Sequence, residues 1–166
     1  MILETQRLRI TELTIEDAPF FFNLVNDDDW KRFIGDRNVK TIVDAEDYLT
    51  GKIIPSYNRL GFGFYLVSEK KSGKPLGISG FIDREGLDFV DVGFAFLPTG
   101  RGKGYGYEST KALLEHGQQK LAFHTILALA NKSNERSHNL LKKLGFRFSM
   151  HIKLHNEDEE ICLFTN

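Results

Sequence analysis

The chain has 166 residues, of which 41% are hydrophobic and 27% charged, a length and composition that fit one globular domain with a buried core. Its 22 basic and 23 acidic side chains leave a formal net charge of −1, which excludes a global field that would attract nucleic acid or an anionic membrane. The single cysteine excludes an intrachain disulfide and a cysteine metal cluster. We therefore expect one domain over residues 1–166 in a reducing cytoplasm, with no signal peptide and no membrane-spanning run.

The first third of the chain predicts one strand and two helices. Residues 7–13 alternate apolar and polar side chains as a strand does. Thr14 begins a capping-box pattern, and about a dozen residues at helical spacing follow it. The acidic run at residues 26–29 ends this helix as a solvated loop, and residues 30–38 show no clear period. A second helix begins at a Thr41 cap and is closed by Pro55.

In the middle of the chain, side-chain character alternates from one residue to the next, as it does in strands. Residues 61–69 and 76–84 form a predicted antiparallel pair, and a turn at residues 85–88 leads to a nine-residue apolar strand at 89–97. On this strand, alternation separates two sets of side chains. One face carries Val90, Val92, Phe94 and Phe96, and the other carries Asp91, Gly93, Ala95 and Leu97.

A glycine-rich turn joins that strand directly to a long helix ending near Lys120. The turn, RGKGYG, consists of Arg101, Gly102, Lys103, Gly104, Tyr105 and Gly106. The first N–H groups of a helix have no intrahelical partners, so a turn of this kind favours an anion, and its two basic side chains reinforce the sign. The alternative is a sharp turn without a ligand. No Lys-Ser or Lys-Thr completes a Walker motif, and the glycine spacing does not match a dinucleotide-binding fingerprint.

The last quarter predicts a crossover and a hairpin. Residues 125–131 form a buried apolar run, which we expect to be a strand parallel to 89–97 because a helix separates the two. Asn134 caps the next helix, and Gly145 stops it. Residues 146–154 and 161–164 then form a hairpin, with the turn at residues 156–160.

The pattern Arg101-x-x-Gly104-x-Gly106 resembles the pyrophosphate loop [Q/R]-x-x-G-x-[G/A] of the GCN5-related N-acetyltransferases, the GNAT family. The strand VDVGFAFLP, the pair Asn134-x-x-Ser137 and the triplet Leu144-Gly145-Phe146 resemble its ribosomal-protein N-terminal acetyltransferase (RimJ/RimL-like) subgroup. The resemblance runs in order along nearly the whole chain. It implies an α+β fold, with a mixed, mainly antiparallel sheet of six to seven strands, helices on both faces, and a V-shaped opening between strands 89–97 and 125–131.

The resemblance also implies an acyltransferase that uses acetyl-CoA as cosubstrate and no metal. It moves the acetyl group to a primary amine, either a protein N-terminus or a small molecule, by direct attack in a ternary complex of a monomer or homodimer. Such a site must take a proton from an ammonium, stabilise an oxyanion and protonate a thiolate. A non-catalytic acyl-CoA sensor of the same fold is the alternative. RNA binding is disfavoured because the fourteen phenylalanines lie mostly at core periodicity.

The resemblance assigns the cofactor contacts. Backbone N–H groups near Phe94, Ala95, Phe96 and Leu97 should hold the pantetheine, the residues from Arg101 to Gly106 should hold the pyrophosphate, and Asn134 should contact the cofactor arm. Replacing Gly104 by a bulky residue should then weaken cofactor binding with little loss of fold.

Catalysis and acceptor binding are assigned with less support from motifs. Ser137 matches the hydroxyl that donates a hydrogen bond to the leaving sulfur, although Asn-x-x-Ser at a helix start is also a common cap. Asp91, an acid in an apolar strand, is the first candidate for a base acting through water, and Asp83 is the second. Trp30, Arg32 and Phe33 are expected to line the acceptor cleft, or else to be ordinary packing and surface residues. The acids at 27–29 weakly favour a cationic acceptor.

Overall fold

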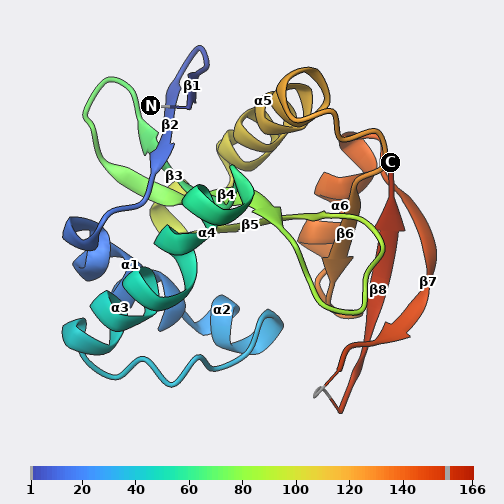
Figure 1. Cartoon of the computed structure of the whole chain (residues 1–166), viewed down its shortest axis with the longest axis horizontal. Coiled ribbons are helices and arrows are strands. Elements are labelled where there is room, and N and C mark those ends of the chain that lie inside the picture. Colours follow the sequence, from blue (N-terminus) through green and yellow to red (C-terminus); the bar gives the residue numbers. More distant parts are fainter. Residues whose placement is uncertain (1, 156–157) are drawn as a thin grey trace.

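The protein is described by a computed structural model that covers residues 2–155 and 158–166. Its strands form one eight-stranded sheet in the order β1-β2-β3-β4-β5-β6-β8-β7 (Figure 1). The strands are β1 (Leu3–Glu4), β2 (Leu8–Glu12), β3 (Phe64–Glu69), β4 (Pro75–Ile82), β5 (Asp91–Phe96), β6 (Leu127–Ala130), β7 (Arg147–Lys153) and β8 (Glu160–Thr165). The helices are α1 (Ala18–Val25), α2 (Asp28–Phe33), α3 (Ile42–Tyr48), α4 (Ile54–Leu60), α5 (Tyr105–Lys120) and α6 (Glu135–Lys143). The predicted α+β class is confirmed, and the strand beyond the expected seven is the two-residue β1.

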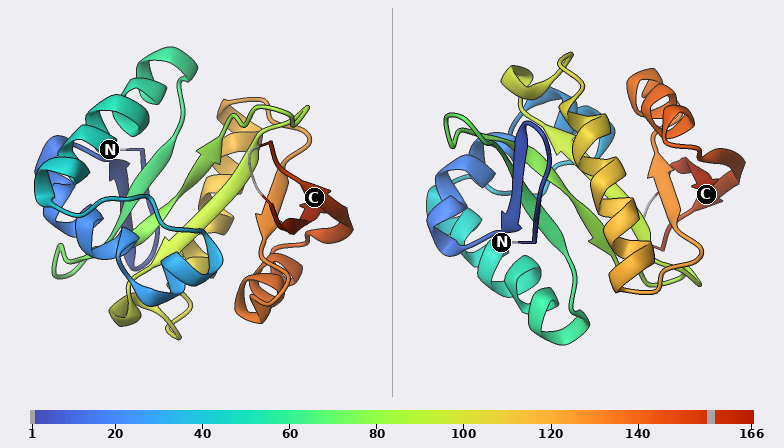
Figure 2. Two further views of the ribbon diagram at one scale, coloured as in Figure 1. Left: turned by 90° about the horizontal axis from the view of Figure 1, so that it is seen from below. Right: turned by 90° about the horizontal axis from the view of Figure 1, so that it is seen from above.

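The two faces of the sheet are covered by different parts of the chain (Figure 2). On one face, Val92 and Phe96 of β5 pack in a core with side chains of α5 and α6, including Leu113 and Leu141. On the other face, a second core joins the sheet to α1, α2 and α3, and the β5 side chain that packs against it is Ala95. The predicted alternation along residues 89–97 is therefore confirmed, and it places Asp91 on the face covered by α1 to α4.

The N-terminal third differs from the prediction at residues 26–29. These residues do not form a solvated loop, because α2 begins here with Asp27 as its N-cap, accepting a hydrogen bond from the Asp29 N–H group at 3.1 Å. The helix was missed because it has six residues and buries only Trp30, too little for a period to appear. The Thr14 capping box is confirmed, although a 3₁₀ turn precedes α1.

The prediction that Pro55 ends the second helix is wrong. A π-helical segment, Leu49–Ile53, follows α3, and Pro55 then lies in the first turn of α4. The chain stays helical through this junction, where the Ile54 N–H group donates to the Leu49 carbonyl, and the wider π-helical turn before Pro55 accommodates the missing N–H group. The helix ends instead at Gly61, whose φ of +78° is the left-handed conformation that glycine tolerates.

The crossover strand opens the sheet. β6 runs parallel to β5, as predicted, but the two pair only through Asp91 with Leu127 and Val92 with Ala128. By contrast, β4 pairs with β5 along its whole length. Beyond Val92 the two parallel strands therefore separate. The C-terminal hairpin of β7 and β8 is confirmed, and of its predicted turn, residues 156 and 157 lie outside the described part of the chain.

Candidate active site

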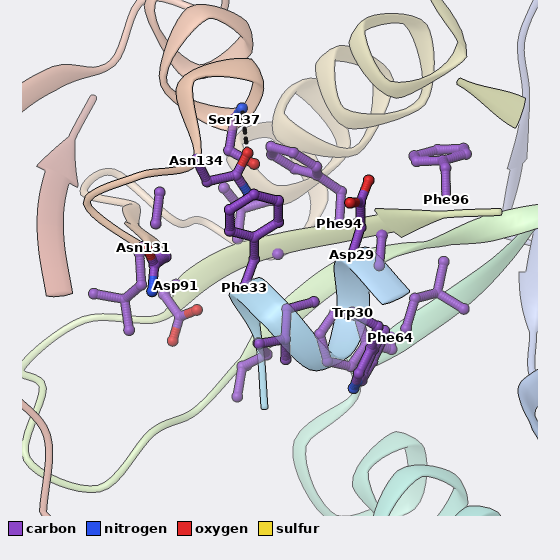
Figure 3. A pocket seen from close by; sticks show the side chains of 18 of the residues that line it. Asp29, Trp30, Phe33, Phe64, Asp91, Phe94, Phe96, Asn131, Asn134 and Ser137 are labelled. Atoms are coloured by element: carbon purple, nitrogen blue, oxygen red, sulfur yellow. Dashed lines mark hydrogen bonds between the residues drawn. The ribbon is translucent and has the colours of Figure 1, made fainter. Parts of the chain in front are cut away.

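A cavity of about 1330 Å³ occupies the opening between β5 and β6 (Figure 3). It extends from the α5 turn and the start of α6 across the strand edges to the surface formed by α2 and α4. The cavity therefore connects the two faces of the sheet at the place where the β5 edge is uncovered.

The free edge of β5 presents backbone groups to this cavity. The Leu97 N–H group donates to the Leu76 carbonyl of β4 at 2.9 Å, and the Val90 carbonyl accepts from the Leu127 N–H group on the β6 side at 2.9 Å. Because backbone groups alternate direction along a strand, Phe94 and Phe96 direct their N–H groups toward the side that β6 leaves open. Leu97 turns toward β4, and it is not among the cavity-lining residues.

The glycine-rich turn ends in a helix N-terminus with free donors. Gly104 is the N-cap of α5 with φ +79°, and Gly102 has φ +71°. The first backbone hydrogen bond at this end runs from the Glu108 N–H group to the Gly104 carbonyl at 3.0 Å. The N–H groups of Tyr105 and Gly106 precede it and have no place in the helical ladder. This is the geometry that favours a phosphate group.

Arg7 holds this turn from outside. Its Nη1 donates to the Lys103 carbonyl at 2.9 Å, its Nε pairs with Glu108 Oε2 at 2.6 Å, and its guanidinium lies 4.6 Å from the centroid of the Tyr105 ring. No sequence motif links Arg7 to residues about a hundred positions away, so sequence reasoning missed it. Lys103, which was expected to face the ligand, is not among the residues that line the cavity.

Arg101 lines the cavity, but its charge is already paired. It forms ion pairs with Asp27 and with Asp29, and Asp29 also pairs with Arg136 in the first turn of α6. Two of the three acids of this run, Asp27 and Asp29, are thus bound to arginines, and only Asp28 is exposed without an ion pair to a described residue. The sequence does not reveal these pairs because a charge run carries no signal of its distant partners.

Asn134 and Ser137 lie at the start of α6 and both line the cavity (Figure 3). The Asn134 side chain accepts a hydrogen bond from the backbone N–H group of Ser137 at 3.2 Å, so Asn134 is the N-cap as predicted. Since the cap uses the Ser137 backbone, it leaves the hydroxyl available for another partner.

Asp91 lies at the base of the opening and is 1% exposed. Arg84, which the sequence did not single out, donates to its two oxygens from Nε at 2.9 Å and from Nη2 at 3.3 Å. Burial raises the pKa of the Asp91 carboxyl above its ordinary value, while the hydrogen bond and charge of Arg84 oppose the rise. Asp83, the second candidate base, is exposed and also lines the cavity.

The predicted cleft residues Trp30, Arg32 and Phe33 all line the cavity from α2. Trp30 is 7% exposed and packs edge-on against Phe21 with ring centroids 6.4 Å apart. Its indole Nε1 is buried without a hydrogen-bond partner among the described residues. The Arg32 guanidinium lies 4.8 Å from the Phe33 ring centroid and stays exposed.

The structure thus gathers the predicted site residues around one cavity, with Leu97 and Lys103 as the exceptions. In the described part of the chain, no group of three or more His, Cys, Asp or Glu side chains could hold a metal ion. Nor does any helix there have the length and apolar character needed to cross a membrane.

Comparison with known proteins agrees with this geometry. The Acetyltransferase (GNAT) domain family matches residues 7–147. The uncharacterized N-acetyltransferase YnaD of Bacillus subtilis (strain 168) is 27% identical over 147 residues, covering 89% of this chain and 83% of YnaD.

Two solved structures share the fold. Spermidine N-acetyltransferase from Vibrio cholerae, in complex with CoA and spermine, superposes with a TM-score of 0.79 at 14% identity, covering 98% of this chain and 96% of that one. Ribosomal-protein-S5-alanine acetyltransferase from Vibrio fischeri gives a TM-score of 0.81 at 18% identity, covering 99% and 94%. Since the family match spans most of the sequence and the fold agrees, the chain belongs to the GNAT family and is an N-acetyltransferase.

Proposed function

We propose that the protein transfers the acetyl group of acetyl-CoA to a primary amine by direct attack in a ternary complex, as a single-domain member of the RimJ/RimL-like subgroup. The observation that carries this proposal is the parting of β5 and β6 after Val92 and Ala128, next to the free N–H groups at the start of α5. An extended thioester with a charged end needs both features, a strand edge to pair with and an anion site.

The residues present fit acetyl-CoA. The N–H groups of Tyr105 and Gly106 suit the pyrophosphate, and those of Phe94 and Phe96 suit the amides of the pantetheine. Gly106, Leu140 and Phe96 all line the cavity. A Cβ added at Gly106 would lie 3.2 Å from Leu140 Cδ2 and 3.6 Å from Phe96 Cε2, so a side chain here would narrow the cavity. When bound, acetyl-CoA supplies an activated acyl group.

The chain's own residues would supply the proton transfers. Asp91 would act as the base that takes a proton from the ammonium through water, which needs its ionised form. Ser137 would donate a hydrogen bond to the leaving thiolate from the opposite side of the opening. Backbone N–H groups on the β5 edge would stabilise the charge that develops on the acyl oxygen.

The test is a thiol-release assay with the purified chain, acetyl-CoA and a panel of peptides and small amines. Release that depends on the amine, together with a mass increase of the acceptor by one acetyl group, supports the proposal. Binding of acetyl-CoA without release for any amine would instead favour the acyl-CoA sensor.

A further inference from the structure

The side of the cavity opposite α5 carries unpaired positive charge. The basic side chains concerned line the cavity from α2, the loop after it, the π-helical segment and α4. They are Lys31, Arg32, Arg37, Lys52 and Arg59, and together we call them the basic wall. All five are exposed, and none forms an ion pair with a described residue. Their charge is therefore available to a ligand.

Nearby acids offset the charge of the basic wall only in part. Asp27 and Asp29 are paired with Arg101 and Arg136, and Asp91 is paired with Arg84. Asp36, which lines the cavity from this side, and Asp28 of α2 form no ion pair with a described residue, so two acids stand beside the five basic side chains. On the other rim, Asp83, Asp158 and Glu159 line the cavity without an ion pair to a described residue, whereas Glu160 pairs with Lys132. The mouth of the cavity is therefore positive on one side and negative on the other.

The cofactor does not account for the basic wall. The free N–H groups that suit its pyrophosphate belong to α5, which covers one face of the sheet, whereas α1 to α4 cover the other face (Figure 2). The wall thus faces the end of the cavity from which the amine would approach.

We propose that the acceptor is a primary amine that carries carboxylate groups, bound with those groups on the basic wall. This rests on the proposed function and narrows its substrate class. The negative rim at Asp83, Asp158 and Glu159 then attracts the ammonium end, so the two rims orient the acceptor. A polycation, in contrast, would meet repulsion along the wall.

The experiment compares acceptors of equal length and opposite charge. The probes are Ala-Asp-Glu-Ala-Asp amide, its uncharged counterpart Ala-Asn-Gln-Ala-Asn amide, a lysine counterpart, free glutamate and spermidine. We expect kcat/KM for the acidic peptide to exceed that for the uncharged peptide by about tenfold at low salt, mainly through KM, and the ratio to shrink as salt screens the wall. Free glutamate separates a small amino acid from a peptide as the source of the carboxylate.

Two double variants test whether the preference for the acidic peptide comes from the basic wall. The double variant Lys52→Glu with Arg59→Glu should abolish the preference, while Lys71→Glu with Lys74→Glu, the same charge change away from the cavity, should retain it. Equal use of acidic and uncharged peptides, a preference for spermidine, or an unchanged preference in the wall variant would overturn the inference.

A binding measurement keeps the inference separate from the proposed function. With CoA present, the anisotropy of the acidic peptide labelled at its C-terminus reports binding without turnover. Binding that the Lys52 and Arg59 double variant loses supports the acceptor class. If no amine is acetylated, the proposed transfer activity is wrong, but this acceptor class still stands. Absence of binding to the unmodified chain would overturn the acceptor class.

Discussion

The Nη1 atom of Arg101 lies 3.0 Å from the Oδ2 atom of Asp29, which joins the glycine-rich turn to α2 across the cavity. Asp29 also pairs with Arg136 of α6, so one carboxylate connects both sides of the opening. An anionic ligand at the turn would compete with this carboxylate for Arg101.

Asp29→Asn should therefore strengthen acetyl-CoA binding by about twofold to fivefold, because it removes a negative charge that competes for Arg101. Titration calorimetry at low and high salt measures the change, which should fade as salt rises. Asp28→Asn is the matched control, since Asp28 is exposed on the same helix and forms no ion pair with a described residue. Weaker binding in Asp29→Asn would mean that Asp29 orients Arg101 for the ligand.

Arg84→Gln should shift the acidic limb of the pH–rate profile to higher pH. Burial raises the pKa of Asp91, and Arg84 limits that rise, so removing Arg84 raises the pKa further. The base needs the ionised form, whose fraction grows as pH rises through this pKa, so more alkaline conditions are needed for the same rate.

The profile of kcat/KM from pH 4 to 9 measures this shift. Arg84→Lys, which keeps a positive charge, should shift the limb less, and Asp91→Asn should remove it and lower the rate. A limb that stays in place in Arg84→Gln, or persists in Asp91→Asn, would assign the base to another group.

Ser137→Ala should lower kcat by about 10²- to 10⁴-fold if the hydroxyl assists the leaving thiolate. Its melting temperature should stay unchanged, because the helix cap uses the backbone N–H group of Ser137, which alanine retains. Asn134→Ala removes the cap acceptor and should cost about 0.5–2 kcal/mol of stability. Thermal unfolding and steady-state kinetics of both variants separate the roles, and a normal kcat in Ser137→Ala would leave that residue no catalytic part.

Gly106→Ala should weaken acetyl-CoA binding with little loss of fold, because Gly106 is helical and its added Cβ would point toward Leu140 and Phe96. Gly104→Ala should lower both affinity and melting temperature. Its φ of +79° disfavours any side chain by roughly 1–2 kcal/mol, and the added Cβ would meet Arg7 Nη2 at 3.3 Å. This corrects the expectation from sequence that Gly104 could be replaced with little loss of fold. Calorimetry paired with thermal unfolding checks both variants. Unchanged affinity in Gly106→Ala would contradict the idea that a side chain at this position narrows the cavity for the cofactor.

The central part of the fold was predictable because its signals are local. Alternation along residues 89–97 fixed which side chains face each core, and the turn from Arg101 to Gly106 indicated the anion site from neighbouring residues alone. A two-residue β1 is too short to produce a period.

The missing parts of the site depend on contacts between distant residues. Arg7 reaches Glu108, and Asp29 reaches Arg101 and Arg136, through pairs that no spacing rule encodes. Pro55 differs for a local reason, because the π-helical segment before it continues into α4 and the proline therefore lies inside a helical stretch. Sequence patterns report periodicity and caps, whereas ion pairs between remote segments emerge from the packed fold.

The two backbone pairs that join β5 to β6 make the sheet resemble a pair of tweezers, with Val92 and Ala128 at the pivot. β5 moves together with β4, to which it is paired along its whole length, and its residues 93–96 extend roughly 13 Å beyond the pivot at about 3.3 Å per residue. A rotation of about 10° of this half of the sheet at the pivot therefore widens the tip by about 2 Å. The packing around Val92 therefore sets the width of the opening at Phe96. A substitution beneath the pivot would therefore change the width of the opening at Phe94 and Phe96 without lining that opening itself.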